Sequence, residues 1–365
     1  MSTCRDCSHE STKAYEFNSV ENVLMMTGSP ILNRPQDLFA QLHLIDPLGY
    51  SSERRFLQAY CRQDWYTKKW SFAPGGLERL VKQISAKFVK RDRESAGITV
   101  PPQEIINHDL TLDPAEYPEQ YQVLQALNKH AAILLGDGKA ISILYLIALI
   151  TRKRQAIVYP EGIELKDQDG QVVYKVDCHE SIKLDKLIKA NGETNSYQTP
   201  SGLIPDLGDE RIVVFSQFKQ PLKELERRLT EAGYSVVRYD GETPEHIRQE
   251  AQLDFDRKTM GDKPKYQIML ANYKAGGVGL NFTGATQAII LDREWSPGKE
   301  GQALGRIDRI GQTEETTVHV IRVKNSIDIW LDNLIAQKKE MIEGFETEID
   351  MTQSLKDFLE DGDNL

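Results

Sequence analysis

The stretch GQALGRIDRIGQT, residues 301–313, places Arg306 and Arg309 three positions apart. On a helix this spacing puts both guanidinium groups on one face, where they can reach a single anion. A guanidinium is planar, permanently charged and multidentate, so it suits a phosphate group. The pattern predicts half of a phosphate clamp. Surface ion pairs with Asp308 and Glu300 are the alternative interpretation.

A phosphate-binding loop of the form GxxxxGK[ST] would complete such a clamp, but the sequence contains none. The pair Gly138-Lys139 does not form one, because no glycine stands five residues before Gly138. Ala140 also occupies the place of the Ser or Thr that must bind Mg²⁺. The other half of the clamp is therefore not found in these 365 residues.

The charge of the chain is uneven. The formal net charge is -10, which by itself argues against nucleic-acid binding. Residues 79–93, however, carry six basic groups and one acidic group, and TRKR at 151–154 adds three more basic groups. Such a basic stripe is able to bind a phosphate backbone, and a solvated helix face is the alternative.

The cysteines favour a reducing compartment over a disulfide framework, since there are only four in 365 residues. Cys4, Cys7 and His9 form a CxxCxH that could begin a zinc site, but no second ligand pair follows at usable spacing. We therefore expect no bound metal from this motif. The apolar run 140–150 is too short to cross a bilayer, and no signal peptide is apparent, so an intracellular protein without membrane contact is expected.

In the second half, short apolar runs alternate with amphipathic stretches. Strands are expected at 211–217, 234–241, 266–272, 288–294 and 316–323, with helices at 219–233 and 243–258 and a helix carrying the two arginines. Continuous apolar strands separated by helices predict an α/β fold with a parallel sheet covered on both faces. In such folds ligands bind beyond the carboxyl ends of the strands, where the glycine-rich AGGVGLN and the arginine helix are expected to lie.

The first half reads differently. Residues 36–205 are expected to be largely helical, with a small hairpin near VVYKVDCHE and a linker at 191–202. Four parts are predicted: 1–35, 36–205, 206–325 and 326–365, the last an amphipathic helix followed by an acidic tail.

Seven ordered blocks resemble a known family. RIVVFSQF, RYDGETPEHIRQ, the stretch from LANYKAGGVGLN to GRIDRIGQT, and VHVIRVKNSIDIWLDNLIAQK are similar to second-lobe motifs of Swi/Snf-type helicase-like ATPases of superfamily two. LMMTGSPILNRPQDLFAQL, residues 24–42, resembles the end of their first lobe. The spacing from Phe39 through YC at 60–61 to GGL at 75–77 is more similar to the annealing-helicase branch than to nucleosome remodellers.

The resemblance implies two RecA-like lobes that close on ATP and Mg²⁺, with the second lobe supplying arginines. It also implies that residues 1–35 are a remnant of the first lobe, 36–205 a family-specific insertion, 206–325 the second lobe and 326–365 a brace helix. The first lobe's Walker motif and Asp-Glu-Ala-His box are not present. DCSH at 6–9 keeps only Asp6 and His9 of that box, and Cys7 stands at the glutamate position.

The family's roles carry over to matching positions. Arg309 would be the principal arginine finger and Arg306 its partner. The ATP interface would include Gln302, Gly277, Gly279 and Asp308; DNA contacts would come from Ser216, Gln217, Lys274, Ala275, Gly276 and Trp295; and Thr27, Gly28 and Ser29 would couple the lobes. Ser296 departs from the family's usual Trp-Asn-Pro.

The expected function is that of the C-terminal portion of an ATP-dependent translocase on double-stranded or forked DNA, without sequence preference. The first lobe would lie upstream or on a separate chain, and this chain alone would be inactive. The expected location is the nucleus of a eukaryote, or the cytoplasm or nucleoid of a bacterium or virus-infected cell. The alternative is a non-catalytic module that binds DNA or a partner ATPase.

Overall fold

The computed structural model describes residues 23–26, 35–63, 65, 70–87, 89, 96–136, 143–166, 172–191, 196–273 and 280–344. The chain divides into two compact units. The first comprises Met1–Asp92 with Glu340–Glu348, and the second comprises Arg93–Lys339 with Ile349–Leu365.

The first unit is a small helical cluster with one hairpin. Its elements are α1 (Pro35–Ile45), α2 (Glu53–Tyr60), β1 (Cys61–Gln63), β2 (Trp70–Phe72) and α3 (Gly76–Ile84). Leu38, Phe56 and Leu80 are buried together in its core. Gly76 lies so close to the end of α2 that an added Cβ would be 2.1 Å from the Tyr60 carbonyl oxygen, so only glycine fits there without a shift of the backbone.

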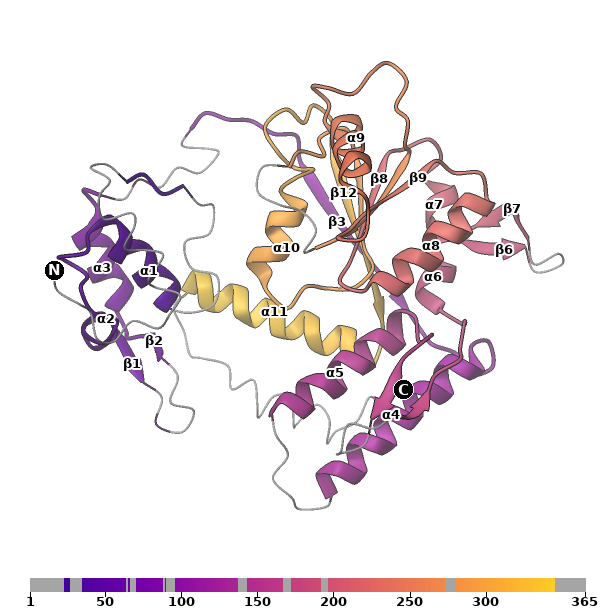
Figure 1. Cartoon of the computed structure of the whole chain (residues 1–365), viewed down its shortest axis with the longest axis horizontal. Coiled ribbons are helices and arrows are strands. Elements are labelled where there is room, and N and C mark those ends of the chain that lie inside the picture. The colour runs from indigo at the N-terminus through magenta and orange to yellow at the C-terminus, as the bar shows by residue number, and fades with distance from the viewer. Residues whose placement is uncertain are drawn as a thin grey trace. The chain divides into compact units, whose positions relative to one another are not determined.

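The second unit is built on a six-stranded sheet in the order β3-β12-β11-β8-β10-β9, and all its pairings are parallel (Figure 1). Its strands are β3 (Gln103–Leu110), β8 (Ile212–Ser216), β9 (Val236–Tyr239), β10 (Ile268–Asn272), β11 (Gln287–Ile290) and β12 (Thr316–Val323). Between these last five strands, β8 to β12, and after them, the chain forms α8 (Lys219–Glu231), α9 (Glu245–Phe255), α10 (Pro297–Leu304) and α11 (Ile327–Gly344). The expected α/β fold with a parallel sheet is confirmed.

The central strands are apolar except at their carboxyl ends, Ser216 and Asn272, because helices cover both faces of the sheet. In β8, Ile212 and Val214 point to the face covered by α8, whereas Val213 and Phe215 point to the face covered by α9 and α10. All five residues of β8 and of β10 are buried. A continuous apolar run is what a strand buried on both faces requires.

Further helices and two hairpins precede β8. They are α4 (Pro118–Gly136), α5 (Ile143–Val158), β4 (Glu164–Lys166), β5 (Val172–Lys175), α6 (Ile182–Leu187), β6 (Lys189–Asn191), β7 (Ser196–Ser201) and α7 (Leu203–Asp206). The expected hairpin at VVYKVDCHE is present as β4–β5. The stretch 191–202, predicted to be a linker, instead contributes β7 to an antiparallel pair with β6.

One strand of the sheet was not predicted. β3 comes from the region expected to be largely helical and pairs along its whole length with β12. Its polar sequence, QEIINHDL, has the alternating exposure of an edge strand, and only its partner β12 identifies it as part of this sheet. No helix among the described residues is long and apolar enough to cross a membrane.

Candidate ATP-interface and nucleic-acid site

The two arginines lie beyond the helix that was expected to carry them. α10 ends at Leu304 and has Gly305 at its C-cap. The chain continues in tighter turns, in which the Arg306 amide donates to the Ala303 carbonyl at 3.3 Å. The prediction that both arginines share one helix face is therefore wrong, since they lie in the loop between α10 and β12.

Arg306 and Arg309 nevertheless lie within electrostatic range of each other. Burial lowers the pKa of Arg306, a nearby Tyr239 raises it, and the positive charge of Arg309 lowers it. The Arg306 guanidinium lies 6.0 Å from the centre of the Phe282 ring, and Arg309 Nη1 donates to the Leu280 carbonyl at 2.9 Å. The arginine loop is thus packed against residues 280–282.

Glu300 is not the partner of these arginines. Its carboxylate accepts from Arg293 Nε at 2.9 Å and from Arg293 Nη2 at 2.7 Å. Arg293 also donates to Asp332 on α11 at 2.7 Å. Arg293 therefore joins α10 to α11, and the Glu300 part of the alternative ion-pair interpretation does not hold. Gln302 is exposed on α10, and Asp308 is half-buried.

Polar side chains meet at the carboxyl ends of β8 and β11. Ser216 is fully buried, and its hydroxyl donates to Asp292. The Gln217 amide donates to both carboxylate oxygens of Asp292, at 3.2 and 3.1 Å. In this conformation the Ser216 hydroxyl is directed at a neighbouring strand, so its contact with DNA stays a prediction.

The buried guanidinium of Arg154 contacts two of the predicted DNA-binding residues, Gln217 and Trp295. Its Nη1 donates to Gln217 Oε1 at 3.3 Å, and its guanidinium lies 5.1 Å from the ring centre of Trp295. Arg154 also forms an ion pair with Asp292 at 3.6 Å. Burial raises the pKa of Asp292 and lowers that of Arg154, while the charge of each partner opposes that effect.

The basic stripe predicted from TRKR at 151–154 is not a solvated surface. Lys153 is 1% exposed and Arg154 3% exposed. Both belong to the interior of the second unit, where a buried charge needs a partner. In the run 79–93, Arg79, Lys82 and Lys87 are exposed, as expected for a basic surface.

Trp295 and Ser296 lie at the start of α10. Trp295 packs against Trp330 of α11 with the ring centres 6.0 Å apart. Ser296 is 5% exposed, and its hydroxyl oxygen has no hydrogen-bond partner. The departure from Trp-Asn-Pro thus places a buried hydroxyl without a partner at the first turn of α10.

Several predicted residues lie outside the described part of the chain. They are Thr27, Gly28 and Ser29 near the N-terminus, and Lys274, Ala275, Gly276, Gly277 and Gly279 after β10. Their roles stay predictions.

Asp292, Arg293 and Arg154 were missed as members of this site. The signal for Asp292 and Arg293 was their position directly after an apolar strand, where polar residues gather at the ligand-binding edge. Arg154 had no such signal, because it lies within a basic run on α5 and only the tertiary fold brings it to β8.

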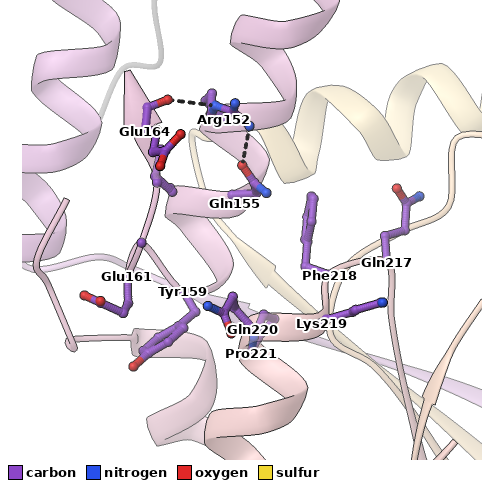
Figure 2. Close-up of a pocket in the computed structure, with 12 residues that line it drawn as sticks. Arg152, Gln155, Tyr159, Glu161, Glu164, Gln217, Phe218, Lys219, Gln220 and Pro221 are labelled. Atoms are coloured by element: carbon purple, nitrogen blue, oxygen red, sulfur yellow. Dashed lines mark hydrogen bonds between the residues drawn. The ribbon is translucent and has the colours of Figure 1, made fainter. Parts of the chain in front are cut away.

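A cavity of about 340 Å³ lies next to this edge, between the end of α5 and the start of α8. Gln217, Phe218 and Lys219 line one side, and Arg152, Tyr159 and Glu161 the other (Figure 2). Arg152 donates to the Glu164 carbonyl and to Gln155 Oε1, each at 3.1 Å. The cavity carries side chains of both charges.

Comparisons with known proteins agree with the fold and the motifs. Residues 201–311 match the model of the helicase conserved C-terminal domain. Protein CHROMATIN REMODELING 5 of Arabidopsis thaliana is 26% identical over 340 residues, which are 90% of this chain and 18% of that protein. Chromodomain-helicase-DNA-binding protein 8 of Rattus norvegicus is 27% identical over 315 residues, 85% of this chain and 12% of that protein. The chain spans less than a fifth of either relative.

Two solved structures are similar at low scores. The C-terminal part of the Fun30 ATPase domain has a TM-score of 0.49 and 21% identity, and the match covers 72% of this chain and 99% of that one. The Sulfolobus solfataricus SWI2/SNF2 ATPase core in complex with dsDNA has a TM-score of 0.48 and 22% identity, covering 92% and 63%.

The parallel sheet, the motif order and the matched domain together define a helicase C-terminal lobe. Residues 201–311 match the helicase conserved C-terminal domain, and most of the chain is similar to Swi/Snf-type helicase-like ATPases. The narrower similarity to the annealing-helicase branch stays a prediction.

Proposed function

We propose that this chain is the C-terminal portion of an ATP-dependent translocase on double-stranded DNA, in which Arg309 and Arg306 act on ATP held by a first lobe. The observation that carries the proposal is the arginine loop itself. The two guanidinium groups influence each other electrostatically, Arg309 is exposed, and both contact residues 280–282. Two positive charges in one loop make a field that attracts an anion such as a phosphate group.

The role of these arginines follows from the charge of the reaction. In phosphoryl transfer, negative charge spreads over the oxygens of the transferred group, and an arginine finger stabilises that charge. ATP and Mg²⁺ would be held mainly by the first lobe, since the sequence contains no GxxxxGK[ST]. When the lobes close, Arg309, which is exposed, would reach the phosphates first, and the half-buried Arg306 would stand behind it.

The contact with residues 280–282 supports a link between hydrolysis and DNA. These residues follow directly after 274–279, the stretch that resembles the family's DNA-contacting motif. A shift of the arginine loop on closure would therefore be passed to that stretch through Leu280 and Phe282. DNA contacts of this kind go to the backbone and read no sequence. We place the activity on chromosomal DNA, in the nucleus of a eukaryote or the nucleoid of a bacterium.

A non-catalytic module that binds DNA or a partner ATPase is the second candidate. The observation in its favour is the absence of GxxxxGK[ST] from the sequence. A module of this kind would have no use for paired arginines, and this difference separates the two candidates.

The test measures ATP turnover by the purified chain, with and without duplex DNA, alone and after addition of a first lobe that carries the phosphate loop. We expect no turnover by the chain alone and DNA-stimulated turnover in the mixture. DNA-stimulated turnover by the chain alone, abolished by Arg309→Ala, would contradict the need for a first lobe. No turnover in the mixture, with DNA binding retained, would favour the non-catalytic module.

A further inference from the structure

Three side chains that can ligate a metal meet near the β4–β5 hairpin, beside the cavity that Glu161 lines. They are Glu161, which follows α5, and Asp177 and His179, which follow β5. One ligand atom from each lies within 4.8 Å of the other two. Their spacing in the sequence forms no metal-binding motif, because Glu161 is distant from the other two along the chain.

The backbone builds this cluster. Residues 176–179 alternate between interior and surface: Val176 and Cys178 are each 2% exposed, whereas Asp177 and His179 are exposed. Successive side chains of an extended segment point to opposite sides, so Asp177 and His179 share the outer side. Glu161 is held against them because its carboxylate accepts from the Cys178 amide at 3.1 Å.

The imidazole of His179 lies between the two carboxylates. Its Nε2 is 3.5 Å from Asp177 Oδ1, and its Nδ1 is 4.0 Å from Glu161 Oε2. Nδ1 also lies 3.1 Å from the Tyr159 hydroxyl. A second hydrogen bond of this type fixes the ring of a metal-binding histidine and sets its tautomer. Figure 2 shows Tyr159 and Glu161 close together at the side of the cavity away from Gln217.

We propose that Glu161, Asp177 and His179 bind one divalent ion of the zinc type. One imidazole nitrogen and two carboxylate oxygens are a donor set that Zn²⁺ accepts, with water in the fourth position. The imidazole separates this site from an ordinary acidic patch, since it favours Zn²⁺ over Mg²⁺ and Ca²⁺.

The ligand atoms have to move closer together when an ion binds. In a tetrahedral site with ligand atoms about 2.1 Å from the ion, those atoms are about 3.4 Å apart, so the widest separation in the cluster has to contract by up to roughly 1.4 Å. The side chains of Asp177 and His179 are 91% and 70% exposed, and they are free to make this movement. The bound ion would join the end of α5 to the segment after β5, at the base of the β4–β5 hairpin. This inference is independent of the proposed function.

The experiment titrates Zn²⁺ into the purified chain by calorimetry at about pH 7.5. Cys4→Ser and Cys7→Ser form the background of every sample, because their CxxCxH motif is a separate potential ligand set. The compared variants are His179→Gln and, as a control, His246→Gln, which changes an exposed histidine on α9.

We expect one Zn²⁺ per chain, affinity reduced by tenfold or more in His179→Gln and unchanged in His246→Gln. Zn²⁺ should raise the midpoint of thermal unfolding, and Mg²⁺ should not. Absence of saturable Zn²⁺ binding, equal affinity in His179→Gln, or equal binding of Mg²⁺ would each overturn the proposal. His179 is exposed, so circular dichroism should show native folding of the variant.

Discussion

Acid should selectively weaken the junction between β3 and the rest of the sheet, because two histidines meet there. His108 Nε2 on β3 lies 3.0 Å from His319 Nδ1 on β12, and His319 Nε2 lies 3.0 Å from Gln287 Oε1 on β11. The amide oxygen of Gln287 only accepts, so His319 carries its proton on Nε2 and its Nδ1 accepts from His108. A proton added to His319 Nδ1 would face the N–H of His108.

The pKa of His319 gives the magnitude. Burial lowers it from 6.5 to about 4, and the charges of His108 and Lys186 add to this effect. His319 is 5% exposed, so solvent screens little of this effect. The folded protein binds the proton more weakly than the unfolded chain, so the stabilisation is complete above pH 6.5. It is lost as the pH falls from 6.5 towards 4. At about 1.4 kcal/mol per pH unit, the total loss is about 3 kcal/mol.

The assay is urea unfolding followed by circular dichroism at several values between about pH 7.5 and about pH 4.5. His319→Gln keeps a donor and an acceptor but does not titrate, so the wild-type chain should lose roughly 2–3 kcal/mol more than this variant over that range. His246→Gln, an exposed control, should follow the wild type. If the free energy of unfolding fell equally with pH in the wild type and in His319→Gln, protonation of His319 would not be the cause of the loss.

Three further predictions concern other parts of the chain. Asp292→Ala removes the ion partner of the buried Arg154 and should lower the free energy of unfolding by about 3–5 kcal/mol in the same urea assay. Replacing Arg154 by Met in addition should recover part of that loss. A loss below about 1 kcal/mol in Asp292→Ala would contradict the importance of this ion pair. Gly76→Ala should lower the unfolding midpoint of the first unit, because its Cβ would collide with the Tyr60 carbonyl. Gly261→Ala, in open space, should not lower that midpoint, and equal midpoints would contradict this packing. Duplex DNA binding, measured by fluorescence anisotropy, should weaken at least about tenfold between roughly 50 and 200 mM salt and show little sequence preference. An affinity that does not change with salt would contradict a role of the basic run 79–93 in DNA binding.

The sequence predicted those parts of the fold in which local pattern and final environment agree. The first four residues of β8 and of β10 are apolar, and such a continuous apolar run predicts a strand that is buried on both faces. The motif order likewise identified the second lobe. β3 could not be predicted in this way, because its polar residues only acquire a strand's environment by pairing with β12.

The errors at the site have physical causes. The arginine spacing suggested a continued helix, but Gly305 follows Leu304, and glycine is about 1 kcal/mol less favourable in a helix than alanine. The buried Ile307 then directs the chain back to the sheet. Lys153 and Arg154 appeared to be surface charges, since a sequence does not show which cations will be buried, as Arg154 is beside Asp292 from a distant part of the chain.

The central claim is that Arg309 stabilises charge on a phosphate held by a first lobe. Its most direct test is steady-state ATP turnover by this lobe combined with a first lobe on saturating DNA, comparing Arg309→Ala with Arg227→Ala, a change at an exposed arginine on α8. We expect Arg309→Ala to lower kcat by about a thousandfold or more with little change in KM, and Arg227→Ala to keep the wild-type kcat. An Arg309→Ala enzyme with wild-type kcat would contradict it.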